Sequence, residues 1–335
     1  MIIPSPASPQ WFCMATLTPT FAAAHHPDDV HYHRVPPVRR EEALSLLLTG
    51  SPHGSRGVVE QFLSFVADQS MSLDHLWGAY RADDHSLLAS TLLVHCAGRT
   101  AMTFVSPPRS EVSAEIVGAL VQAACASQEP MRVRIVQGLL EASQIRESQS
   151  LASAGFQRLA TLVYMQRTGL PALEPLRLDE SIEIIHWQPH LRHLFCEAIE
   201  ASYVETADCP GLLGLRDIED ILDGHMATGE FTPHLWMVLR CGDEPVGVML
   251  LNPVLKRQAM ELVYLGFAKN WRGKGLGRRL LLHGLGLTRN ERIKQVILAV
   301  DEANAAAVNL YKSMKFTPTA RKIAMIWPVL EKTSS

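Results

Sequence analysis

The hydrophobic positions of the C-terminal half follow two different periods, which predict helices and strands in alternation. Apolar residues recur at helical spacing in four segments, 189–203, 216–226, 276–288 and 304–314. Five shorter runs are predicted to be strands, at 235–240, 247–251, 260–267, 295–300 and 323–327. A meander of strands followed by a strand–helix–strand–helix unit predicts an α/β (α+β) fold with a mixed sheet flanked by helices.

The pattern occurs twice along the chain. The tripeptide His-Leu-Trp at 75–77 recurs at 234–236, a shift of 159 residues. Three further matches follow at shifts of 158 to 160: Leu-Leu at 92–93 with 250–251, Ala-Met at 101–102 with 259–260, and Phe156 with Phe316. Four matches in order at nearly one shift predict a duplicated domain. We expect domains at 31–167 and 181–335, joined by a Pro- and Leu-containing linker at 168–180.

The overall composition narrows the class of protein. A length of 335 residues favours two domains. A net charge of −3 gives no electrostatic reason to expect nucleic acid or a membrane surface as a partner. There is no apolar run long enough for a transmembrane helix. The six cysteines are scattered and form no CxxC pair, so we expect reduced thiols and a cytoplasmic protein.

The first 30 residues are rich in Pro, Ala and Ser and are expected to be a disordered tail without a signal peptide. Met14 leaves open a later start of the chain. Four histidines, His25, His26, His31 and His33, cluster around Asp28 and Asp29. A metal site is conceivable there, but no element that could fix ligand geometry is visible, so we expect a polar segment and no metal.

A glycine-rich segment follows the strand 260–267. Residues 272–277 read Arg-Gly-Lys-Gly-Leu-Gly, and a helix is predicted to begin directly after them. Such glycines allow positive φ and close approach of a ligand, and free N–H groups at a helix N-terminus bind phosphates. The dinucleotide pattern would need Gly where Arg278 stands, and the P-loop pattern lacks its Lys-Ser/Thr pair. A purely structural tight turn remains the alternative.

A second segment follows the strand 295–300. Asn304 is a good helix N-cap, and Tyr311 lies two turns further along the same helix face. The phenol would then lie beside the predicted phosphate site. The alternative is that Tyr311 is an ordinary core residue near the end of an amphipathic helix.

Together these two segments resemble the GNAT superfamily of N-acetyltransferases. Its signature R/Q-x-x-G-x-G/A matches 272–277, and its second signature N-x-x-A-x-x-L-Y matches 304–311, followed by Phe316. The resemblance covers about 182 to 330. One departure is Lys315, where the family commonly has Gly, which is expected to strain that turn slightly.

The resemblance implies an acetyl group carried by coenzyme A and direct attack by a primary amine of a small molecule or peptide. In the family, N–H groups of the glycine loop hold the pyrophosphate, and the end of the fourth strand polarises the thioester. Tyr311 matches the general acid that protonates the leaving thiolate. The implied cofactor-binding residues are Leu265, Gly266, Phe267, Arg272, Gly273, Lys274, Gly275, Leu276, Gly277, Arg278, Asn304 and Tyr311.

The remaining roles are carried over by position. Glu261 lies on the fourth strand, eleven residues before Arg272. This spacing resembles that of the glutamate that serves as general base in the superfamily's histone acetyltransferases, so Glu261 is predicted to be the base, acting through water. Glu302 is a weaker candidate for the same role. Asp208 and Cys209 occupy the loop where the family builds its amine pocket. Asp208 could hold an ammonium group, whereas Cys209 is expected to be inert.

The N-terminal half is expected to have lost its site. Residues 106–111 contain no glycine, and Leu151 stands at the position equivalent to Tyr311. We therefore predict a degenerate, structural domain, in a tandem layout that resembles GNAT proteins of the mycothiol synthase type. Two alternatives remain open for the whole chain: a catalytically silent module that senses acyl-CoA, and a transferase of another acyl group.

Overall fold

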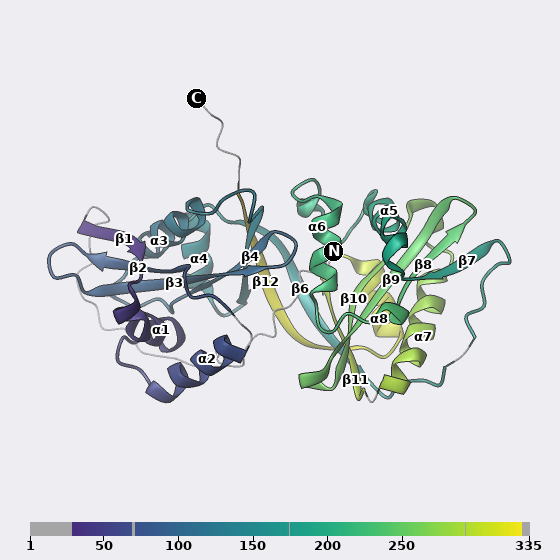
Figure 1. The fold of residues 1–335 in the computed structure, drawn as a ribbon, viewed down its shortest axis with the longest axis horizontal. Helices are drawn as coiled ribbons and strands as arrows, with labels where there is room; N and C mark the ends of the chain where they lie inside the picture. The colour runs from purple at the N-terminus through teal and green to yellow at the C-terminus, as the bar shows by residue number, and fades with distance from the viewer. Residues whose placement is uncertain (1–28, 69–70, 174, 292, 330–335) are drawn as a thin grey trace, which may run out of the picture. The chain divides into compact units, whose positions relative to one another are not determined.

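The computed structural model describes residues 29–68, 71–173, 175–291 and 293–329. These residues form two compact units, which we describe separately (Figure 1). The N-terminal unit comprises 29–159 and 323–329, and the C-terminal unit comprises 160–322.

Helices and strands follow one another in the same order in both units. In the N-terminal unit they are β1 (Val30–Arg34), α1 (Arg40–Thr49), α2 (Arg56–Asp68), β2 (Leu76–Arg81), β3 (Leu87–Cys96), β4 (Thr100–Val105), α3 (Ala114–Ala126), β5 (Ile135–Glu141) and α4 (Ile145–Ser153). In the C-terminal unit they are β7 (Ile182–His186), α5 (Arg192–Tyr203), α6 (Ile218–Met226), β8 (Trp236–Cys241), β9 (Glu244–Val254), β10 (Ala259–Phe267), α7 (Leu276–Thr288), β11 (Gln295–Asp301) and α8 (Ala305–Ser313). The mixed α/β fold and the repeated layout predicted from the sequence are confirmed.

The last strand of each repeat departs from this simple division. β6 (Gln157–Thr168) follows α4 of the N-terminal unit, yet its residues 162–168 pair antiparallel with the whole of β11. β12 (Thr317–Pro328) follows α8, yet its residues from 323 onward belong to the N-terminal unit, next to β5 in strand order. Within the C-terminal unit the strand order is therefore β12-β6-β11-β10-β9-β8-β7. The chain passes between the units at residue 160 and again at 323.

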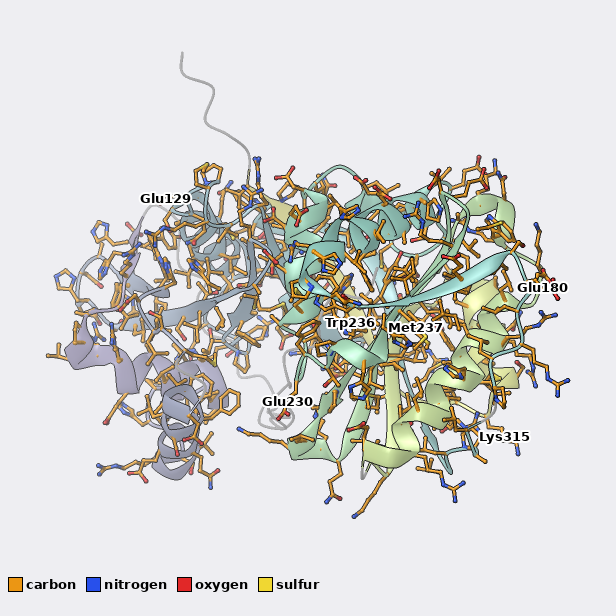
Figure 2. The ribbon with its side chains drawn as sticks, turned by 45° about the vertical axis from the view of Figure 1, so that its right-hand side comes forward. Glu129, Glu180, Glu230, Trp236, Met237 and Lys315 are labelled. Carbon is orange, nitrogen blue, oxygen red and sulfur yellow. The ribbon has the colours of Figure 1, made fainter. Side chains whose placement is uncertain are left out.

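The sheet of the C-terminal unit is buried on both faces. Figure 2 labels Trp236 and Met237, neighbouring residues of β8, whose side chains must point to opposite faces. Trp236 packs against Phe195 of α5, with ring centroids 6.2 Å apart. Met237 belongs to the apolar core that also contains Leu280 of α7. Helices α5 and α7 therefore cover opposite faces, which leaves the ends of the strands as the place for a ligand.

The turn after α8 adopts the conformation that glycine favours. Lys315 has a φ of +64°, and its counterpart in the N-terminal unit, Gly155, has a φ of +93°. In both turns the next residue, Phe316 or Phe156, donates its N–H to a carbonyl five residues back at 3.0 Å. A side chain in this region costs roughly 1–2 kcal/mol. Lys315 lies at the surface (Figure 2), and its side chain is exposed.

Candidate active site

The two central strands of the C-terminal unit separate along their length. β10 and β11 pair in parallel from Ala259 to Glu261 and from Gln295 to Ile297. Beyond this ladder β10 continues along β9 as far as Phe267, and β11 continues along β6 as far as Asp301. The gap between the diverging strands opens into a pocket of about 430 Å³, which we call the wedge pocket. Main-chain groups at its edges are free of the usual partner strand and can bind a ligand instead.

The glycine loop forms one wall of the wedge pocket. Gly273 and Gly275 have φ values of +75° and +76°, in the left-handed region that the sequence predicts for them. Gly275 is the N-cap of α7, so the first N–H groups of this thirteen-residue helix point toward the pocket. A Cβ at either glycine would meet no other protein atom within 4 Å. The space beside them is therefore open to a ligand, and an anion is favoured there.

The three basic residues of this loop make different contacts. The Arg272 side chain donates to the carbonyl oxygens of Phe267, Ser202, Val204 and Glu205 at 2.8 to 3.0 Å. It lines the pocket but chiefly satisfies the carbonyl groups at the end of α5. Arg272 therefore ties β10 to α5 and is not a free phosphate ligand.

Two further cations flank the loop. The Nζ atom of Lys274 lies 4.4 Å from the ring centroid of Trp271, a cation–π contact, and Lys274 does not line the wedge pocket. Arg278 does line it and also donates to the Ser313 hydroxyl at 3.1 Å. Among the three basic residues, Arg278 is placed best to meet a phosphate.

The helix opposite the glycine loop contributes Asn304 and Tyr311. The Asn304 side chain accepts from the N–H of Ala307 at 3.2 Å, which confirms the predicted N-cap. Tyr311 is 5% exposed and belongs to the apolar core, yet it also lines the wedge pocket. Burial raises the pKa of Tyr311 well above its ordinary value, and the charge of Asp208 acts in the same direction. Tyr311 is thus both a core residue and part of the pocket wall, and its phenol keeps its proton at neutral pH.

The loop between α5 and α6 forms the third wall. Asp208 lines the wedge pocket, and its carboxylate accepts from the main-chain N–H of Asp301 at 3.1 Å. Cys209 is fully buried and does not line the pocket. Burial raises the pKa of its thiol to about 12, as expected of an inert cysteine. Of these two neighbouring residues, therefore, only Asp208 can contact a ligand in the wedge pocket.

Glu261 lies outside the wedge pocket. It lines a smaller pocket of about 180 Å³ together with residues of β6, β11 and β12, among them Gln166 and Thr319. Burial raises the pKa of Glu261 to about 7, opposed by the positive charge of Arg257. Glu302, the weaker candidate, is ion-paired with Arg321 at 2.9 Å. Glu261 is the last residue of β10 in the ladder with β11, so its pocket begins where the wedge closes.

Sequence reasoning missed Tyr264, which also lines the wedge pocket. Strict alternation would put Tyr264 and Glu261 on opposite faces of β10. A bulge between Leu262 and Tyr264 inserts one residue and brings both side chains to one face. The Ser202 hydroxyl donates to the Ile199 carbonyl at 2.7 Å, so the Tyr264 hydroxyl, 2.6 Å from Ser202 Oγ, is the donor in that second bond.

The corresponding place in the N-terminal unit is filled. Leu151 occupies the position of Tyr311 and is 1% exposed. A Cβ on Gly138 of β5 would lie 2.6 Å from the Leu151 side chain, so this leucine packs directly on the strand. Arg109, in the loop that lacks glycines, donates to the carbonyl of Leu88. These contacts fit the predicted loss of a phosphate-binding loop.

Among the residues that the structure describes, no group of three or more His, Cys, Asp or Glu side chains could hold a metal ion. His25, His26 and Asp28 of the histidine cluster lie outside these residues. Within the same residues, no helix has both the length and the apolar character needed to cross a membrane.

Comparisons with known proteins match part of the chain to acetyltransferases. Residues 199–316 match the acetyltransferase (GNAT) family. A mycothiol acetyltransferase from Thermobispora bispora is 51% identical over 57 residues, which are 17% of this chain and 19% of that protein. A peptidyl-lysine N-acetyltransferase from Salmonella typhimurium is 36% identical over 98 residues, 28% of this chain and 57% of that protein. The matches therefore span less than two thirds of either relative.

The fold also has a counterpart among solved structures. A GCN5-related N-acetyltransferase from Sphaerobacter thermophilus superposes with a TM-score of 0.55 at 17% identity, covering 90% of this chain and 96% of that one. At this identity the likeness concerns the fold alone.

Proposed function

We propose that this chain, whose C-terminal unit carries a GNAT-family acetyltransferase domain, moves an acetyl group from acetyl-CoA to a primary amine in a ternary complex. One observation carries the proposal. A single pocket brings together the N-terminus of α7, the unpaired edge of β10 and the Tyr311 phenol. Anion binding, carbonyl polarisation and proton donation are three of the tasks that thioester aminolysis requires, and removal of the amine proton is the fourth.

Each wall of the pocket then has a role. The N–H groups of residues 273–278 bind the pyrophosphate, and the main chain of Leu265 to Phe267 binds the pantetheine and polarises the thioester carbonyl. The amine nitrogen forms a bond to the acetyl carbon, and the carbon–sulfur bond breaks. Tyr311 donates its proton to the departing thiolate, so that CoA leaves as the thiol.

The two alternatives are a silent acyl-CoA sensor and a transferase of another acyl group, and only the sensor makes a different demand on Tyr311. A silent acyl-CoA sensor needs no proton donor at the sulfur, and the presence of the Tyr311 phenol in the pocket wall supports the enzyme. A different acyl group would use the same residues. The purified chain is incubated with acetyl-CoA or longer acyl-CoA thioesters and a panel of amines, and thiol release is followed. This measurement separates the three cases. No thiol release with any amine would favour the sensor.

The relatives suggest both kinds of acceptor. One is named for mycothiol and the other for peptidyl-lysine. The same panel should therefore contain small amines and a lysine-containing peptide, and the better substrate decides between a small-molecule and a peptide acceptor.

Glu261 lines the neighbouring pocket and not the wedge pocket, so we propose it as a base that takes the amine proton indirectly, through water, at the point where the wedge closes. It must be ionised to do so, and because burial raises its pKa to about 7, kcat/KM should rise with pH up to about 7 and level off above it. Glu261→Gln should remove this rise and lower kcat/KM by about 10²-fold. A pH–rate profile of both proteins is the measurement, and an unchanged profile in the variant would exclude Glu261 as the base.

The same carboxyl group affects folding with a definite sign. Its pKa in the folded protein lies above the ordinary value of 4.5, so the folded state binds the extra proton. The contribution of Glu261 to the free energy of unfolding is therefore fully present below about pH 4.5 and is lost as the pH rises through about 7. Glu261→Gln should flatten this part of the pH dependence of the unfolding midpoint.

A further inference from the structure

The loop 205–209, whose first four residues line the wedge pocket, is held in an unusual conformation. Glu205 has a φ of +50° and Cys209 a φ of +47°, and neither is a glycine. Each such residue costs roughly 1–2 kcal/mol, and strain of this kind gathers at functional sites. The residue between them that lines the pocket with an acidic side chain is Asp208.

Several hydrogen bonds fix Asp208 in place. Its N–H donates to the Thr206 hydroxyl at 3.1 Å, and its carboxylate accepts from the N–H of Asp301 at 3.1 Å. In return, the Asp301 carboxylate accepts from the N–H of Cys209 at 3.2 Å. This reciprocal pair ties the loop to the end of β11, which is itself a wall of the pocket. The Asp208 carboxylate is therefore preorganised and not a mobile surface group.

Glu205, Asp208 and Arg272 bring charged side chains to this side of the pocket. Glu205 is ion-paired with Lys269 at 2.5 Å, and the Arg272 guanidinium donates to four main-chain carbonyls. The negative charge of Asp208 also contributes to the raised pKa values of both Tyr311 and Tyr264, which line the same pocket. The Asp208 carboxylate therefore interacts electrostatically with Tyr311, the proposed proton donor to the leaving thiolate.

We propose that Asp208 selects the acceptor: it attracts amines that carry a further positive charge and repels amines that carry a carboxylate. The substrate class is thereby narrowed to cationic amines such as diamines, and away from amino acids. This inference rests on the proposed acetyl transfer, but it concerns recognition only. Asp208 is a specificity-determining residue, while proton transfer stays with Glu261 and Tyr311.

A matched pair of probes tests this selection. 1,4-Diaminobutane and 4-aminobutanoate present the same primary amine on a four-carbon chain, and only the far end differs in charge. The wild-type kcat/KM should favour the diamine by at least about tenfold, since opposite and like charges differ by this much across a partly buried pocket. In Asp208→Asn the ratio should fall to within about threefold, because the charge is gone.

The substitution Asp208→Asn keeps the loop intact, since the amide oxygen of the new side chain can still accept from the N–H of Asp301. Asp243→Asn, at a fully exposed turn, is the matched control and should keep the wild-type ratio. An unchanged ratio in Asp208→Asn, or a wild-type preference for 4-aminobutanoate, would overturn the proposal.

Binding measurements separate this proposal from the proposed function. Both probes are titrated into the wild-type chain saturated with CoA, and the diamine should bind more tightly. Equal binding, or none by the diamine, would overturn the role of Asp208 even if other amines are acetylated. Failure of acetyl-CoA itself to bind would instead overturn the acetyl-transfer function.

Discussion

Replacing Tyr311 with phenylalanine should lower kcat by about 10²- to 10⁴-fold, the usual contribution of a positioned general acid. The ring is retained, so its contact with Phe316, with centroids 5.7 Å apart, and the shape of the pocket should stay. The Kd for acetyl-CoA should therefore be unchanged. Steady-state kinetics and calorimetric titration on the same preparation measure both quantities.

Tyr80→Phe is the matched control for this change. Tyr80 is a buried tyrosine of the N-terminal unit, 2% exposed, and its loss of a hydroxyl should leave kcat unaffected. Because burial raises the pKa of Tyr311, the wild-type enzyme should also keep its activity at alkaline pH, where an ordinary phenol begins to ionise. A Tyr311→Phe variant with wild-type turnover would remove this residue as the acid.

A fragment that begins at residue 181, the predicted start of the catalytic domain, should fail to fold. It lacks β6, whose residues 162–168 pair with every residue of β11. It also lacks Val163 and Met165, two residues of the apolar core. Each ladder hydrogen bond contributes about 1 kcal/mol, and the total stability of a domain is only about 5–15 kcal/mol. Circular dichroism and thermal unfolding of the fragment measure the loss.

A longer fragment supplies the control. Residues 157–335 restore β6 and its pairing with β11, and this fragment should show a cooperative unfolding transition. If the shorter fragment also unfolds cooperatively and binds acetyl-CoA, β6 is dispensable. The domain boundary predicted at residue 181 would then also be the boundary of a segment that folds by itself.

The parts of the site that could be predicted from sequence are those that depend on local chemistry. Gly273 and Gly275 adopt positive φ because no other residue does so at low cost, and Asn304 caps α8 because its side chain reaches the N–H of Ala307. Helical spacing then places Tyr311 two turns along. Each of these features is decided within a few residues, which a single sequence displays.

The other parts depend on contacts between distant segments. The bulge in β10 that turns Tyr264 into the pocket is set by its pairing with β9. The task of Arg272 is set by carbonyl groups of α5, some seventy residues earlier. The partner of β6 is likewise set at a distance: this strand follows α4 of the first repeat but pairs with β11 of the second, and a single sequence does not display that choice.

The separation of Glu261 from the wedge pocket has the same origin. The motif fixes its distance from Arg272 along the strand, but the point at which β10 and β11 separate decides the pocket it enters. That point is a property of the pairing and not of the spacing.

The most direct test of the account is a calorimetric titration of acetyl-CoA into the whole chain, with sites counted. One site is expected. Gly275→Ala should weaken binding at least about tenfold, since a side chain enters the phosphate space and disturbs the left-handed turn. Gly242→Ala carries the same backbone penalty at an open turn, with a φ of +58°, and should bind as the wild type does. Two sites would contradict the loss of function in the N-terminal unit, and no binding would contradict the acetyltransferase account altogether.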